Sequence, residues 1–104
     1  MPTTPLFKLI KTKIISLAPE QEKTLSEVLQ DVDLSKAAII EIQWIKRNLY
    51  VCQVGVAGAF FTLDNLNIKV VRISPDQADE FCIKSLATSG STEVLINVYA
   101  YVEQ

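Results

Sequence analysis

Residues 38–55 read AIIEIQWIKRNLYVCQVG, two apolar segments separated by a short polar break. Ile40, Ile42 and Trp44 occupy alternate positions, so in an extended chain they lie on one face, while polar residues occupy the other. The break Lys46-Arg47-Asn48 is short enough for a hairpin loop. We therefore expect a β-hairpin here, with the remaining strands arranged around it.

The segments before this stretch predict one strand and one short helix. Residues 7–17 are rich in Ile, Leu, Phe and Thr with interspersed lysines, which suits a strand near a sheet edge. Residues 19–31 change period, and their apolar side chains recur at helical spacing on one stripe. Pro19 suits a first helical position. A second helix over residues 34–40 is an alternative interpretation of the next segment, although its β-branched residues argue against it. The helical stripe consists of Leu25, Val28, Leu29 and Val32.

The segments after this stretch predict further strands separated by turn signals. Residues 55–59 contain two glycines and permit a bend or bulge. Residues 93–103 alternate most regularly, which predicts a strand pinned inside a sheet. Six or seven short strands at such intervals indicate an all-β, mainly antiparallel fold, a small β-sandwich or jelly-roll-like barrel with one short N-terminal helix. The other expected strands cover residues 60–63, 66–73 and 81–87.

Size and charge limit the classes of function. The 104 residues suit one domain over residues 7–104, preceded by a flexible arm over residues 1–6. The net charge of −2 and the lack of a basic block predict no nucleic-acid partner. No apolar run reaches the roughly 20 residues that span a bilayer, so we expect no membrane partner. The N-terminus lacks signal-peptide features, which predicts cytoplasmic synthesis.

The chain offers few groups for chemistry. It contains no histidine, so it cannot build a Ser-His-Asp or Cys-His arrangement. Cys52 and Cys82 lie in apolar surroundings and are expected to be buried free thiols, with a disulfide disfavoured in a reducing compartment. Acidic residues cluster over 20–33 and 76–80, and we interpret them as solvated surface rather than metal ligands or a carboxylate pair. We expect no catalytic residue, no cofactor and no metal, and therefore no enzyme.

The final strand has apolar residues on both of its faces. Tyr99 and Tyr101 share one face with Leu95, while valines, Ile96 and an alanine occupy the other. An isolated sandwich should leave one face mostly polar. Either the core is small and some apolar residues are simply exposed, or another chain covers one sheet surface. Tyrosine is favoured at such interfaces, so we predict these two tyrosines as contact residues, with Pro2 and Pro5 of the arm.

The ending from Ser91 to Glu103, STEVLINVYAYVE, resembles the last strand of small all-β bacteriophage virion proteins. Many proteins of that kind are head-decoration or tail-associated components that work as oligomers on a larger lattice. The Pro-Thr start is similar to their extended arms. The resemblance implies a virion location and a larger protein assembly as partner, and it contains no motif from which functional residues could be transferred.

These observations lead to two main functional hypotheses, while a third, an enzyme that uses a bound metal or carboxylates such as Asp76 and Glu80, is disfavoured. The first is a non-enzymatic structural protein that assembles through β-sheet surfaces into a homo-oligomer, with a trimer as one candidate, as a virion decoration, cement or adaptor component. Its mechanism is burial of apolar surface. The second is a soluble protein-binding module such as an immunity or inhibitor protein, which the acidic balance and missing catalytic groups also fit.

Overall fold

The computed structural model describes residues 6–45, 52–56, 58–63 and 70–102. These residues form eight strands, one short α-helix and two 3-10 turns. The strands are β1 Phe7–Leu17, β2 Glu22–Thr24, β3 Ile39–Trp44, β4 Cys52–Val56, β5 Ala59–Leu63, β6 Val70–Ile73, β7 Cys82–Ser85 and β8 Thr92–Tyr101. The helical elements are α1 Leu25–Val28, η1 Leu34–Lys36 and η2 Pro75–Gln77.

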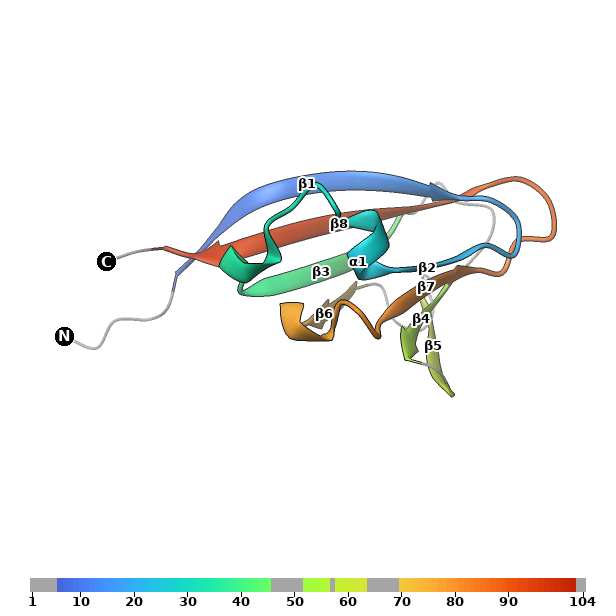
Figure 1. The fold of residues 1–104 in the computed structure, drawn as a ribbon. Helices are drawn as coiled ribbons and strands as arrows, with labels where there is room; N and C mark the ends of the chain where they lie inside the picture. The colour runs from blue at the N-terminus through green and yellow to red at the C-terminus, as the bar shows by residue number, and fades with distance from the viewer. Residues whose placement is uncertain (1–5, 46–51, 57, 64–69, 103–104) are drawn as a thin grey trace.

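The strands form two four-stranded sheets, ordered β1-β8-β3-β6 and β2-β7-β4-β5. All pairings between the described strands are antiparallel, which confirms the predicted fold class, and the arrangement is an open sandwich rather than a closed barrel. β1 and β8 run side by side along the whole sandwich, while β4 and β5 form a small hairpin at one end (Figure 1). We call the sheet that contains β1 and β8 the long sheet.

The predicted hairpin over residues 38–55 is wrong, although its loop Lys46-Arg47-Asn48 lies outside the described residues. Its first strand became β3, which pairs with β8 and β6 in the long sheet. Its second strand became β4, which pairs with β5 and β7 in the other sheet. A short polar break permits a hairpin but does not enforce one, because pairing depends on which strands bury matching apolar faces. The ten-residue β8 offers β3 a longer alternating partner than β4 does.

The predicted helix over residues 19–31 is much shorter in the structure. Residues 22–24 form β2, and α1 begins only after Thr24. Thr24 and Glu27 make a capping box: the threonine oxygen accepts from the Glu27 backbone N–H, and the glutamate accepts from the Thr24 backbone N–H. The predicted apolar stripe is nevertheless buried, since Leu25, Val28 and Leu29 all belong to the core. The alternative second helix is only the three-residue turn η1.

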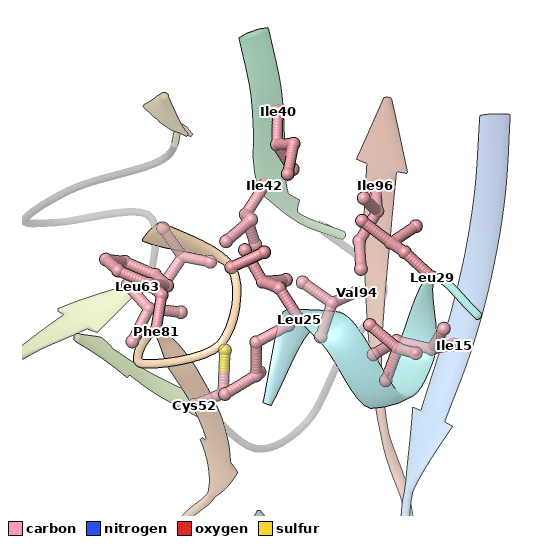
Figure 2. Packing of buried hydrophobic residues seen from close by; sticks show 14 of the residues in the cluster. Ile15, Leu25, Leu29, Ile40, Ile42, Cys52, Leu63, Phe81, Val94 and Ile96 are labelled. Carbon is pink, nitrogen blue, oxygen red and sulfur yellow. The ribbon is translucent and has the colours of Figure 1, made fainter. Parts of the chain in front are cut away.

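The core lies between the two sheets and beneath α1 (Figure 2). Ile40 and Ile42, which the alternation placed on one face of their strand, are fully buried in β3, and so is Ile96 of β8. The other sheet contributes Cys52, whose side chain points into the same interior. Since each strand of the long sheet turns one side toward this core, its alternate residues must lie on the opposite side.

Candidate functional site

The side of the long sheet that faces away from the core is the candidate site, and we call it the outer face. Registered partners in a sheet share a face, so the pairing assigns its members without ambiguity. The outer residues form three rows across the strands. The tyrosine row contains Phe7, Leu9, Ile39, Tyr99 and Tyr101. The polar row contains Thr12, Glu41, Arg72 and Asn97. The aliphatic row contains Ile14, Val70 and Leu95, with Gln43 between the last two.

The tyrosine row is strongly apolar and open to solvent. Tyr101 is 62% exposed, and its ring lies 5.1 Å from that of Phe7 between ring centroids. Leu9 is 53% exposed beside Tyr99, and Ile39 continues the row on β3. Single exposed apolar residues are ordinary, whereas large contiguous apolar patches on protein surfaces are typical of interaction sites.

The polar row is a continuous hydrogen-bonded chain across all four strands. The Thr12 hydroxyl donates to Asn97 Oδ1 over 3.0 Å, and Asn97 Nδ2 donates to Glu41 Oε1 over 3.1 Å. Arg72 Nε donates to the other Glu41 oxygen over 3.0 Å. Glu41 is 8% exposed although it lies on the outer face, so its neighbours already shield its carboxylate from water. The row has no net charge, because the glutamate and the arginine neutralise each other.

Arg72 differs from the rest of the polar row because its side chain remains 65% exposed. Its Nε donates to Glu41, while most of its side chain stays open to solvent. A hollow of about 280 Å³ lies beside it and is bounded by apolar and charged groups together. The lining residues are Phe7, Ile39, Glu41, Arg72 and Tyr99. This hollow can receive an apolar side chain while the guanidinium donates to an oxygen of the incoming surface.

The sequence identified part of this site. Tyr99 and Tyr101, the contact residues predicted on the final strand, both lie on the outer face. Pro2 and Pro5, the predicted contacts from the arm, lie outside the described residues. The Glu41–Arg72 pair was missed because the two residues are 31 positions apart and only the β3–β6 register brings them together. In the sequence, the only signal for this pair is an acidic residue in one expected strand and a basic residue in another, each between apolar neighbours.

Three residues of the two acidic clusters have partners within the chain. Asp31 forms ion pairs with Lys11 and Lys13, each at 3.2 Å, and these lysines lower the pKa of the Asp31 carboxyl. Asp33 accepts hydrogen bonds from Ser35 at the start of η1, which lower its pKa as well. Asp79 accepts from the hydroxyl of Ser26. Within the described parts of the chain, no group of three or more acidic or cysteine side chains is arranged to hold a metal ion.

A second hollow lies at the end of the long sheet where β1 begins and β8 ends. It has a volume of about 770 Å³ and combines two lysines with an apolar base. Its lining residues are Lys8, Ile10, Lys36, Ala100, Tyr101 and Val102. It adjoins the tyrosine row through Tyr101, which lines the hollow and also pairs with Phe7.

The two cysteines are free thiols on opposite faces of the smaller sheet. In the β4–β7 register Cys52 lies opposite Ser85, and Cys82 lies opposite Gly55. Because Cys52 and Gly55 are an odd number of positions apart on β4, Cys52 and Cys82 lie on opposite faces. Burial raises the pKa of the Cys52 thiol to about 12. Cys82 is only half-buried, and partial burial together with the charges of Glu22 and Glu27 raises its pKa.

Cys82 is therefore expected to react with a small maleimide in the native protein, whereas Cys52 reacts only after denaturation. The thiolate is the reactive form, and burial removes both the thiolate and the access that the reagent needs at Cys52. Mass spectrometry after labelling at pH 8 checks this order. Modification of Cys52 at an equal rate would contradict its placement in the core.

The raised pKa of Cys52 also predicts that the protein loses stability at alkaline pH. Its native pKa of about 12 lies above the ordinary thiol value of 9.0. Between these values the unfolded chain releases the proton while the native protein retains it, so stability falls as pH rises, by up to about 1.4 kcal/mol per pH unit. Urea denaturation at pH 8 to 11 measures the slope. Cys52→Ala should flatten it more than Cys82→Ala does, and equal slopes in all three proteins would reject the assignment.

The described residues thus define a two-sheet antiparallel β protein with an organised outer face on the long sheet. The helical elements in these ranges all lack the length and hydropathy that a membrane span requires. Comparison of the chain with models of known protein families, with curated proteins and with solved structures finds no match. The function is therefore inferred from the geometry of the site and from the resemblance of residues 91–103 to the last strand of phage virion proteins.

Proposed function

We propose that this protein is a non-enzymatic structural protein that assembles with copies of itself through the outer face of the long sheet. The observation that carries the proposal is the order of the three rows, in which two apolar rows flank a polar row whose groups bond to one another. Burying the apolar rows is favourable at about 25 cal/mol per Å² of apolar area. Burying Thr12, Asn97 and Glu41 is inexpensive because they already have partners, while Arg72 needs an acceptor from the incoming surface.

The dimensions of the face suit a stable interface. β1 has 11 residues and β8 has ten, so the face is about 35 Å long and four strands, or about 19 Å, wide at its centre. A standard protein interface buries roughly 800 Å² on each partner. The flat area of the face is about 670 Å² at most, which approaches this size, and the exposed rings of Phe7 and Tyr101 add to it.

The polar groups of the face support binding better than they support catalysis. Glu41, the most buried carboxylate of the site, already accepts bonds from Asn97 and Arg72. A general base needs a free lone pair aimed at the substrate proton. The chain also contains no histidine, which removes the commonest acid-base group near neutral pH.

We further propose that the assembly belongs to a virion, as a decoration, cement or adaptor component, on the resemblance of residues 91–103 to phage virion proteins. Such a component binds a larger protein lattice as well as itself. The expected genetic context is a coding sequence beside genes for a major capsid or tail protein. A position beside a toxin or nuclease gene would instead support the immunity or inhibitor function.

The alternative function gains support from one observation. The hollow beside Arg72 would accept a side chain of an unrelated protein together with a carboxylate, as an inhibitor surface does. In that case the chain would be a monomer that forms a tight one-to-one complex with a single target. A larger assembly of copies would speak against it.

Phe7→Lys is expected to convert the assembled protein to a monomer. A lysine in the tyrosine row would place an unpaired charge in the buried interface and remove the ring contact with Tyr101. Size-exclusion chromatography with light scattering, at tens of micromolar protein, measures the change in mass.

The matched control is Phe61→Lys, which makes the same substitution on β5 of the other sheet, where the ring is 56% exposed. This variant should assemble like the parent protein. A parent protein that is monomeric under these conditions would refute self-assembly, and loss of assembly in the Phe61 variant alone would move the interface to the smaller sheet.

A further inference from the structure

We propose that the outer face binds the outer face of a second copy about a two-fold axis that runs along the strands, midway between β8 and β3. This inference rests on the proposed function and specifies the partner and its orientation. Two kinds of two-fold axis within the interface plane bring the outer faces of two copies together with their rows parallel: one runs along the strands, and the other runs across them.

A two-fold axis along the strands leaves the position of each row along the strand direction unchanged. It exchanges β8 with β3 and β1 with β6, since the sheet order is β1-β8-β3-β6. Tyr99 of each copy then lies over Ile39 of the other, beside the hollow that Ile39 and Tyr99 line. In the aliphatic row Ile14 of each copy lies over Val70 of the other, while Leu95 lies over Gln43.

The polar rows are also complementary under this axis. Arg72 on β6 of one copy lies over Thr12 on β1 of the other. The Thr12 hydroxyl donates its proton to Asn97, so its oxygen lone pairs can accept from the exposed guanidinium. Glu41 lies over Asn97, and both are already satisfied within their own chain. Among these four described residues and their mates, no like charges are opposed.

The competing axis runs across the strands through the polar row. It places Glu41 over Glu41 and Arg72 over Arg72, because each strand then lies over itself. Opposed like charges in a desolvated interface are strongly unfavourable. This axis also covers the tyrosine row with the aliphatic row, so the aromatic hollow loses its matching partner. The polar row therefore selects the orientation along the strands.

Two variants with one accessible cysteine each distinguish the axes, because sheets pack about 10 Å apart and neighbouring strands about 4.8 Å apart. In the proposed dimer, position 93 on β8 lies about 11 Å from its symmetry mate, while position 12 on β1 lies about 18 Å from its own. Under the competing axis these separations become about 28 Å and 10 Å. The order of the two distances is thus reversed.

The experiment treats Glu93→Cys and Thr12→Cys, each in the full chain with Cys82→Ala, with a short bis-maleimide and measures covalent dimer on a denaturing gel. Cys52 stays in place because it is buried. We expect several-fold more covalent dimer from the Glu93 variant than from the Thr12 variant. A Gln53→Cys variant, on β4 of the other sheet, is the control and should give only the background of random collisions.

The other outcomes separate the two proposals. Efficient linkage at position 12 and not at 93 would overturn the orientation and leave self-assembly through this face intact. Linkage at neither position in a protein that light scattering finds dimeric would overturn both the orientation and the use of this face. A monomeric parent protein would overturn self-assembly itself.

Discussion

Gly55→Ala is expected to destabilise the protein by about 3 kcal/mol or more. Gly55 has a φ of +152°, and a Cβ built there would lie 2.2 Å from the backbone oxygen of Ala59 and 3.0 Å from the Cα of Phe60. Both are backbone atoms of the neighbouring strand β5, so no side-chain rotation relieves the clash. The cost combines overpacking with backbone strain.

Urea denaturation followed by the fluorescence of the single tryptophan, Trp44, measures this effect. In a chain of this size, 3 kcal/mol corresponds to a fall in melting temperature of roughly 15 °C. Gly58→Ala is the matched control, since its φ of +86° is also unfavourable for alanine but nothing lies within 4 Å of the added carbon. It should lose only about 1 kcal/mol. Equal losses in both variants would contradict the close approach at Gly55.

Ile96→Ala is expected to cost about 2–5 kcal/mol, the range for removing a large aliphatic side chain from a packed core. Ile96 is fully buried at the centre of the long sheet, opposite Ile42 on β3 and Lys13 on β1. The surrounding strands are held by pairings on both sides, so the structure can close the resulting cavity only in part.

The adjacent residue provides a control on the same strand. Leu95 points to the outer face, so Leu95→Ala should change the stability of the monomer by less than about 1 kcal/mol while it weakens assembly. Denaturation of dilute protein and light scattering of concentrated protein measure the two effects separately. If Leu95→Ala destabilised the dilute protein as much as Ile96→Ala, the assignment of core and outer face would be wrong.

Strand positions were more predictable than strand partners. The segment 93–103 alternates regularly and the segment 7–17 is rich in strand-forming residues, and they became β8 and β1 almost residue for residue. Residues 38–55 also became strands where they are described, yet the expected hairpin did not form. Alternation is a property of neighbouring residues, whereas pairing compares segments that are distant in the sequence.

The short helix shows the same difference between a local sequence pattern and a tertiary pairing. The spacing of Leu25, Val28 and Leu29 correctly identified a buried helical stripe. The start of the helix was misplaced, because residues 22–24 pair with β7 and so continue as a strand until the Thr24 cap. Tertiary pairing overrode the local preference that Pro19 and the acids after it suggested.

The sequence by itself determined that this chain folds as an antiparallel β protein, that Ile40 and Ile42 share one face of a strand, and that the final strand carries apolar residues on both of its faces. Only the tertiary structure determined the partition into two sheets and the polar row between the two apolar rows. The physical reason is that Thr12, Asn97, Glu41 and Arg72 come from four separate strands, and their hydrogen bonds exist only after all four are in register.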